Sequence, residues 1–85
     1  MYYVYILQSK IDQKLYTGFT SDLKKRVLRH NAGYVPATKP RRPLTLIFYE
    51  AYLHKYDALR REKYLKSSKG KTTIKQMLKE YLELS

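Results

Sequence analysis

Two short apolar runs near the start of the chain have the composition of β-strands. Tyr2–Gln8 and Leu15–Phe19 contain tyrosine, valine, isoleucine and phenylalanine, which favour an extended backbone. The polar segment Ser9–Lys14 between them supplies a turn. We therefore predict a β-hairpin in which Tyr5 and Tyr16 face each other across the two strands.

The residues after this hairpin predict an amphipathic helix. Gly18 ends the second strand, and a glycine in a strand often marks a close backbone approach. Thr20 or Ser21 can cap the helix, and Asp22 suits its positive N-terminal end. Gly33 suits the left-handed position that closes a helix.

One face of this helix combines apolar and chemically active side chains. Leu23, Val27 and His30 recur at helical spacing, and Arg26 flanks them. Arg26 and His30 are four residues apart, so both project from the same face. The opposite face carries Lys24, Lys25 and Arg29.

The loop that follows, Tyr34–Pro43, is basic and contains prolines. Its cations are Lys39, Arg41 and Arg42. Three cations on a loop with restricted backbone could bind phosphates, or they could belong to an ordinary solvated connection. The sequence leaves these two interpretations open.

The rest of the chain predicts one more strand and two helices. The dense apolar run Leu44–Tyr52 is typical of a central, well-buried strand that pairs with the hairpin. A helix over Tyr56–Lys66 is broken by Ser67–Lys71. Thr72 or Thr73 then caps a last helix, whose apolar stripe is Ile74, Met77, Leu78, Tyr81 and Leu82. The fold class is therefore α+β, a three-stranded sheet in β-β-α-β-α-α order flanked by helices.

Glu62 lies where an apolar side chain is expected. It shares a helix face with Ala58 and Leu65. A carboxylate in such a stripe must be paired, protonated or bound to a cation. Two interpretations would account for the carboxylate. It could form an ion pair with Arg26 or another cation of the first helix, or it could belong to a functional site.

Composition and charge narrow the class of protein. The 85 residues are one domain, residues 1–85, and carry 18 Lys and Arg against 7 Asp and Glu, a net charge of +11. The positive electrostatic field of such a protein attracts polyanions, and nucleic acid is the partner that we predict. The alternatives are an anionic lipid surface, or a basic protein without a polyanionic partner. There is no cysteine, no signal peptide and no apolar run of about 20 residues, so we predict a cytoplasmic protein without a membrane span.

These features, in this order, resemble the GIY-YIG nuclease superfamily, in particular its small stand-alone bacterial members. Tyr3-Val4-Tyr5 and Tyr16-Thr17-Gly18 occupy the places of the two signature triplets. The segment Ser21–Asn31 is similar to the family's arginine helix, with Arg26 as its key cation. Ala58–Lys63 is similar to the helix that carries the family's metal-binding glutamate, here Glu62.

The resemblance implies a metal-dependent phosphodiesterase. Arg26 would stabilise charge on the phosphoryl group, and Glu62 would hold Mg²⁺ or Mn²⁺. Tyr5 would be the base, with His30 as proton acceptor or orienter and Tyr16 positioning water or phosphate, although the two tyrosines could exchange roles. In a strongly cationic pocket the phenolate of Tyr5 would be favoured.

The resemblance leads to a DNA endonuclease as the first hypothesis. The alternatives are a nucleic-acid-binding module with the nuclease fold and little or no activity, and a fragment that binds an acidic protein. Lys69 and Lys71 are candidates for phosphate contacts in place of an asparagine that many family enzymes have late in the chain. The choice of DNA over RNA and the oligomeric state stay open.

Overall fold

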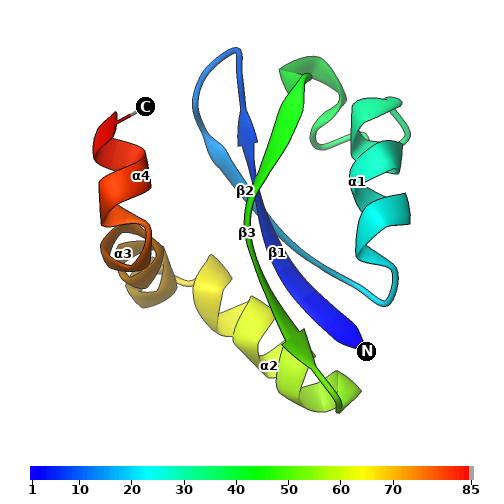
Figure 1. Ribbon diagram of the computed structural model, residues 1–85, viewed down its shortest axis with the longest axis vertical. Coiled ribbons are helices and arrows are strands. Elements are labelled where there is room, and N and C mark those ends of the chain that lie inside the picture. Colours follow the sequence, from blue (N-terminus) through cyan, green and yellow to red (C-terminus); the bar gives the residue numbers. More distant parts are fainter. Residues whose placement is uncertain (85) are drawn as a thin grey trace.

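The protein is a three-stranded antiparallel sheet with helices on both faces (Figure 1). The computed structural model describes residues 1–84. Its elements are β1 (Tyr2–Ser9), β2 (Leu15–Thr20), α1 (Leu23–Asn31), the 3₁₀ helix η1 (Lys39–Arg41), β3 (Leu44–Tyr52), α2 (Lys55–Lys66), α3 (Ser68–Met77) and α4 (Lys79–Leu84). The predicted α+β class, the sheet and the order of its strands and first helices are confirmed.

The central strand is β1 and not β3. The strands lie in the order β2-β1-β3, so β1 is paired on both sides. Its residues 4–9 are all buried, whereas within β3 only Leu44 is. The prediction of a central Leu44–Tyr52 strand is therefore wrong, because a dense apolar run can also occur in an edge strand that contributes to both cores.

A β-bulge explains why the apolar run in β3 is continuous. Ile6 pairs with Phe48 and Leu7 with Leu46, so Ile47 has no partner in the register. The extra residue lets the adjacent Ile47 and Phe48 pack on the same core. The side chains of β3 therefore do not alternate strictly between the two faces of the sheet. As a result the apolar run has the same sequence pattern as a strand that is buried on both faces.

Each face of the sheet has its own hydrophobic core. On one face, Val4 and Ile6 pack with buried residues of α2 and α3, namely Ala58, Leu65 and Ile74. On the other face, Tyr5, Leu7 and Leu44 pack with α1. Alternate residues of β1 therefore pack in separate cores, and Tyr5 belongs to the core under α1.

The ends of α1 are set by local polar contacts. Asp22, and neither Thr20 nor Ser21, is the N-cap, and its Oδ1 accepts a hydrogen bond of 3.1 Å from the amide of Lys25. Gly33 follows the helix with φ of +86°, as predicted. These caps fix the start and the end of the helix whose inward face carries the candidate site.

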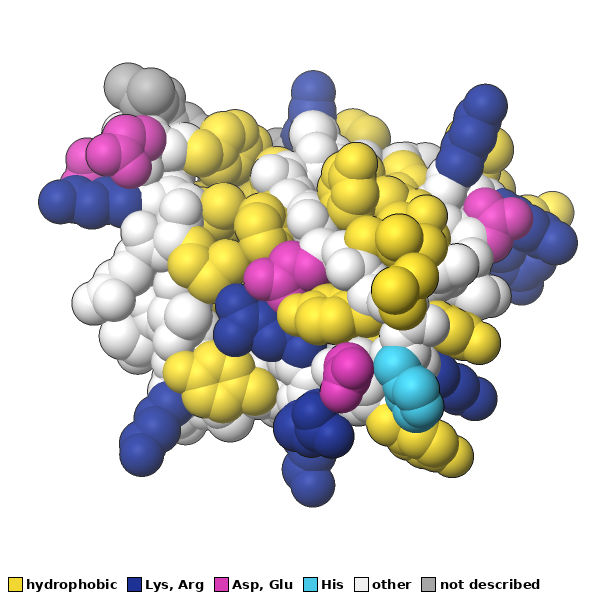
Figure 2. All heavy atoms as spheres, turned by 60° about the horizontal axis from the view of Figure 1, so that its bottom comes forward, with side chains coloured by type: hydrophobic (Ala, Val, Ile, Leu, Met, Phe, Trp, Pro, Cys, Tyr) yellow, Lys and Arg dark blue, Asp and Glu magenta, His cyan; other side chains and the backbone are white. Residues whose placement is uncertain are grey.

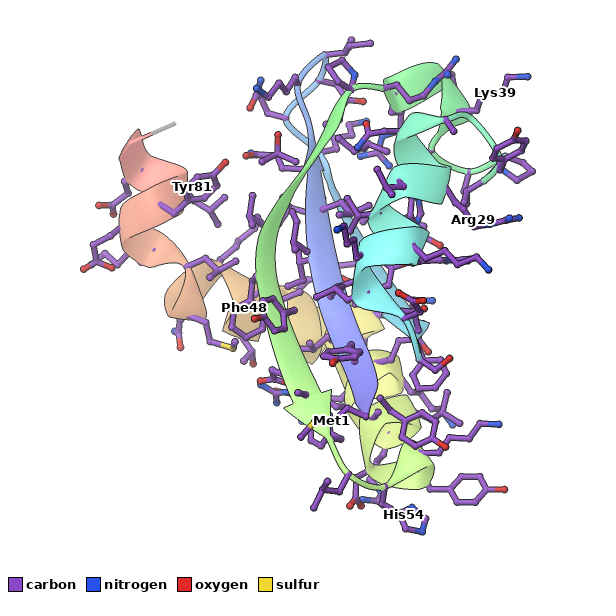
Figure 3. The ribbon with its side chains drawn as sticks, turned by 45° about the vertical axis from the view of Figure 1, so that its right-hand side comes forward. Met1, Arg29, Lys39, Phe48, His54 and Tyr81 are labelled. Atoms are coloured by element: carbon purple, nitrogen blue, oxygen red, sulfur yellow. The ribbon has the colours of Figure 1, made fainter. Side chains whose placement is uncertain are left out.

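The C-terminal region differs from the prediction of a break over Ser67–Lys71 and one long helix. Ser67 alone separates α2 from α3 and caps α3, with its Oγ accepting from the amide of Gly70 at 3.1 Å. Gly70 lies in the first turn of α3, where a Cβ would overlap the carbonyl of Tyr64. The helix then ends near Leu78, and α4 follows. The phenol of Tyr81 donates to Gln8 Oε1 at 2.6 Å, which ties α4 to the sheet (Figure 3).

The surface mixes charges and apolar groups. On the face shown in Figure 2, basic side chains are interspersed with acidic and hydrophobic ones and are not gathered in a single patch. None of the helices in residues 1–84 is long and apolar enough to cross a membrane.

Candidate active site

The site is built on the side chain of Tyr5, which points from β1 toward α1. Tyr5 is fully buried and pairs with Gly18 across the hairpin. A Cβ at position 18 would overlap the Tyr5 phenol and lie 2.9 Å from its Cε1, so the ring needs glycine beneath it. Tyr16 pairs with Leu7, so the two tyrosines are diagonal neighbours with ring centroids 6.5 Å apart. The prediction that they face each other across the hairpin is therefore wrong in register, although the two rings are close.

A chain of hydrogen bonds runs from Tyr5 through His30 into the loop after α1. The Tyr5 hydroxyl is 2.8 Å from His30 Nε2, and His30 Nδ1 is 2.8 Å from Thr38 Oγ1. The hydroxyl of Thr38 donates to the carbonyl of Val35 at 3.4 Å. Both His30 and Thr38 are fully buried.

We assign the proton positions from the partners along this chain, because either ring nitrogen of His30 can donate or accept depending on the tautomer. Because Thr38 uses its only hydroxyl proton on Val35, its Oγ1 accepts from His30, which places the ring proton on Nδ1. His30 Nε2 is then an acceptor, and the Tyr5 hydroxyl donates to it. The arrangement holds a neutral imidazole ready to receive a proton from Tyr5.

Arg26 completes the contacts of the Tyr5 hydroxyl. Its Nε donates to the Tyr5 oxygen at 3.3 Å, and this bond is the main reason why the pKa of the guanidinium is raised. Burial raises the pKa of Tyr5 and outweighs the hydrogen bond and charge of Arg26, which lower it. The expected stabilisation of the phenolate is therefore wrong for this state, because desolvation dominates.

Burial and the charge of Arg26 lower the pKa of His30 to about 4. We expect this to make stability depend on pH. As pH falls below about 6.5, the unfolded chain binds a proton that His30 of the folded chain does not accept until the pH nears 4. The free energy of unfolding should therefore decrease across this window and be unaffected above it.

Urea unfolding of the wild type and of His30→Gln between pH 7.5 and about 4 checks this. The carboxylates of the two chains contribute equally, so the difference between their profiles isolates His30. Parallel profiles would contradict the assignment of a neutral, buried imidazole.

Glu62 approaches the site from α2, on the other face of the sheet. Its side chain is 19% exposed, and its Oε2 pairs with Lys66 Nζ at 3.1 Å. The suggested ion pair with Arg26 or another cation of α1 is wrong, because a lysine one turn further along α2 supplies the partner. The carboxylate still acts on Tyr5, whose pKa is raised in small part by the charge of Glu62.

The donor set fits a hard divalent cation that is held mainly by water and substrate. Within residues 1–84 no three His, Asp or Glu side chains gather in a cluster that could hold a metal. Mg²⁺ keeps several waters and needs only one or two carboxylates together with substrate phosphates. Glu62 is one such carboxylate, so its chemistry is compatible with a single protein ligand to an ion of this kind.

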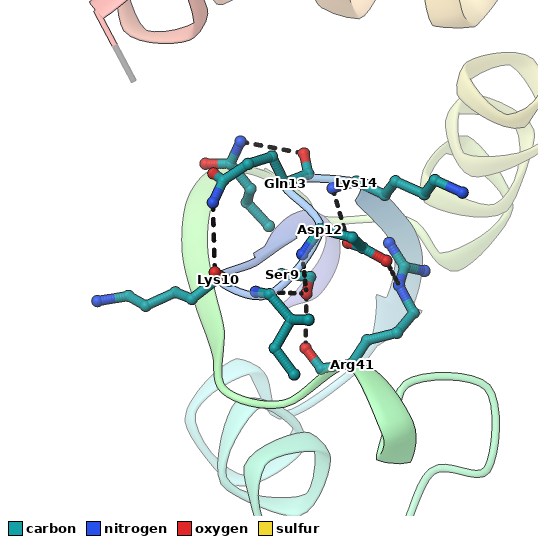
Figure 4. Close-up of polar contacts among 8 residues, drawn as sticks. Ser9, Lys10, Asp12, Gln13, Lys14 and Arg41 are labelled. Atoms are coloured by element: carbon teal, nitrogen blue, oxygen red, sulfur yellow. Dashed lines mark hydrogen bonds and ion pairs between the residues drawn. The ribbon is translucent and has the colours of Figure 1, made fainter.

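The three cations of the loop before β3 have different environments. Lys39 is exposed and extends outward with Arg29 (Figure 3). The guanidinium of Arg41 lies 3.4 Å from Asp12 in the hairpin loop, where Ser9 Oγ also donates to the Arg41 carbonyl (Figure 4). Arg42 Nε donates to the carbonyl of Lys39 at 2.9 Å. Lys39 is thus the exposed residue of the three, while Arg41 and Arg42 are partly buried and contact other parts of the chain.

Sequence reasoning missed two residues that support the site. Thr38 orients His30, yet nothing in a basic, proline-containing loop distinguishes it. Asn31 holds α1 to the start of β3, since its side chain donates to the Leu44 carbonyl at 2.9 Å and accepts from the Leu44 amide at 2.8 Å. A polar residue at the end of an amphipathic helix gives no indication of such a distant partner.

Comparisons with known proteins agree with this geometry. A family model described as the GIY-YIG catalytic domain matches residues 1–76. A UPF0213 protein of Staphylococcus haemolyticus is 40% identical over 75 residues, covering 87% of this chain and 90% of the relative. One from Clostridium perfringens is 45% identical over 67 residues, covering 78% and 71%.

A solved structure supports the same relationship. The solution NMR structure of a UPF0213 protein from Bacillus halodurans aligns with a TM-score of 0.56 and 34% identity, covering 91% of this chain and 85% of that chain. The names of these relatives state no activity.

Proposed function

The chain belongs to the GIY-YIG family, and we propose on this premise that it is a divalent-metal-dependent endonuclease that hydrolyses phosphodiester bonds in DNA. The family implies a nuclease and a nucleic-acid substrate. The observation that carries the proposal for this chain is the hydrogen-bonded set of Tyr5, His30 and Arg26. Buried side chains joined in this way are suited to moving a proton beside a fixed positive charge.

In the proposed reaction a water attacks phosphorus and the bond to the 3′-oxygen breaks. The Tyr5 oxygen is buried behind Arg26 in the substrate-free protein, so Arg26 would first turn toward the phosphate and admit the water. One proton of the water then passes to the Tyr5 oxygen while the Tyr5 proton passes to His30 Nε2, so no free phenolate is needed.

The raised pKa of Tyr5 keeps its proton in place before the reaction, whereas the pKa of His30, lowered to about 4, opposes the transfer in the substrate-free protein. The negative charge of a bound phosphodiester would raise the pKa of His30 and so favour the transfer. The products are a 5′-phosphate and a 3′-hydroxyl: the leaving oxygen takes up a proton from solvent, and the imidazolium of His30 releases a proton to solvent when the products leave, which restores the neutral ring.

The remaining groups act on charge and position. Arg26 offers its planar fork of donors to the phosphoryl oxygens as negative charge develops there. Tyr16, whose ring centroid is 5.0 Å from that of His30, would position the water or phosphate. A divalent ion at Glu62 would supply Lewis acidity at the leaving oxygen.

A second candidate is a nucleic-acid-binding module without significant cleavage. The observation that favours it is the ion pair of Glu62 with Lys66, which occupies a carboxylate that the metal would need. For both candidates we also propose that residues 1–85 form a single domain. We further propose that the protein works in the reducing cytoplasm, because it contains no cysteine.

A cleavage screen distinguishes the two. Supercoiled duplex, single-stranded, branched and RNA substrates would be incubated with Mg²⁺ or Mn²⁺. We expect nicking of DNA that falls at least about 10²-fold in Glu62→Ala and is unchanged in Glu80→Ala, an exposed carboxylate on α4. Salt-sensitive binding with no cleavage of any substrate would favour the module, and cleavage that survives Glu62→Ala would contradict the proposed site.

A further inference from the structure

A groove lies between the start of β2 and the helices α2 and α3. Its volume is about 620 Å³. Four lysines line it, Lys14, Lys66, Lys71 and Lys75, and no acidic side chain does. Lys14 extends outward from the hairpin loop (Figure 4), while Lys71 and Lys75 lie one turn apart on α3.

The same groove has an apolar lining. Leu15 and Leu82 are partly exposed in it, and the buried side chains of Leu65 and Ile74 lie beneath them. Phosphates alone need only cations, and a duplex presents phosphates while its bases stay stacked inside. A row of cations beside apolar surface is instead complementary to a strand whose bases are exposed, with phosphates on the lysines and base faces on the apolar side chains. The volume falls in the range of about 300–1,000 Å³ typical of small-ligand sites, enough for a few nucleotides and not for a duplex.

Two residues connect the groove to the candidate active site. Tyr16 lines the groove and also lies against His30. Lys66 lines the groove and pairs with Glu62 at 3.1 Å. A strand in the groove would therefore pass next to the carboxylate, and its phosphates would compete with Glu62 for Lys66 and so release Glu62 for a metal ion.

We propose that this groove binds an unpaired segment of DNA next to the phosphate that is cut. The inference rests on the proposed nuclease function and adds to it a substrate class, namely DNA with a single-stranded portion beside the cleavage point. Lys14, Lys71 and Lys75 bind its phosphates, and the partly exposed Leu15 and Leu82 contact its bases.

Fluorescence anisotropy with a labelled oligothymidylate of about 12 nucleotides tests the proposal without cleavage. The test variant is Lys71→Glu/Lys75→Glu. Its matched control, Lys55→Glu/Lys79→Glu, makes the same change in net charge at exposed helix positions outside the groove. We expect the groove variant to bind at least about tenfold more weakly than the control, and its salt slope to fall by about 1.4, because each single-strand phosphate contact contributes about 0.7.

Other ligands test the roles of bases and sugar. An abasic oligonucleotide of the same length should bind at least about tenfold more weakly than oligothymidylate, since it offers phosphates without bases. Equal binding of the abasic strand, equal losses in the two lysine variants, or tighter binding of oligouridylate would each overturn the proposal. Amide shifts of wild-type Thr17 and Lys75, absent at Lys55, would support it even if a variant failed to fold.

Failure of this inference and failure of the nuclease function are distinguishable. Groove-dependent binding of oligothymidylate without any metal-dependent cleavage would retain the groove and reject the nuclease. Nicking that depends on Glu62, together with equal oligothymidylate binding by the two lysine variants, would retain the nuclease and reject the groove.

Discussion

Replacing Tyr5 with phenylalanine is expected to reduce metal-dependent cleavage at least about 10³-fold. The change removes the oxygen that would exchange protons with water and His30, and general base catalysis alone contributes about 10²–10⁴-fold. It also removes the acceptor of the Arg26 Nε bond, so the guanidinium loses its anchor. A single oxygen atom thus accounts for both the proton relay and the position of the cation.

The same change should lower stability modestly. His30 Nε2 loses its donor while buried, at a cost of about 1–3 kcal/mol. Single-turnover nicking, measured where urea titration shows the variant to be folded, separates the two effects. Tyr34→Phe, in an exposed ring against Arg29, is the matched control and should be silent. Nicking by Tyr5→Phe within about tenfold of wild type would exclude Tyr5 as the base.

Replacing Gly70 with alanine is expected to destabilise the fold by about 3 kcal/mol or more. Alanine in a helix is normally favoured over glycine by about 0.5–1 kcal/mol. Here its Cβ would overlap the Tyr64 carbonyl and lie 2.5 Å from Leu65 Cα, and both are backbone atoms that no rotamer change can move. Because of this overpacking against the backbone, the change from glycine to alanine destabilises the protein here, although it usually stabilises a helix.

Urea unfolding checks this prediction, with Lys69→Ala as the control on the exposed side of the same turn. The control should change stability by about 0.5 kcal/mol or less. A Gly70→Ala variant as stable as the wild type would mean that α3 can shift away from α2 at little cost. Because α3 supplies Ile74 to the core, such a shift would also be visible in the packing of Val4 and Ile6.

The sequence was sufficient to predict elements whose pattern is local. The hairpin, the inward face of α1 and the closing glycine at position 33 follow from periodicity and backbone preference, and all three are confirmed. It was insufficient where one element depends on a distant one. Because of the bulge at Ile47, the edge strand β3 has the sequence pattern of a central strand. Gly70 was interpreted as a helix break, although it permits the close packing of α3 on α2.

The candidate site divides in the same way. Arg26 and His30 share a face of α1 by simple spacing, and the family resemblance placed Tyr5 beside them; the hydrogen bonds of Tyr5 to both residues agree with this. The partner of His30, Thr38, comes from a loop whose path no periodicity reveals. The balance that raises the pKa of Tyr5 could not be predicted either, because it depends on how completely the ring is desolvated.

The central place of β1 has a consequence for synthesis on the ribosome. The first strand to emerge can pair at once with β2, but its other edge waits for β3, and one of its faces waits for Ile74 of α3. Such long-range pairing delays folding until most of the chain exists. A truncated chain that ends before α3 would leave Val4 and Ile6 covered only by Ala58 and Leu65 of α2. The proposed hydrolytic activity would therefore require α2 and α3 to be folded onto the sheet, although neither helix contains Tyr5, Arg26 or His30.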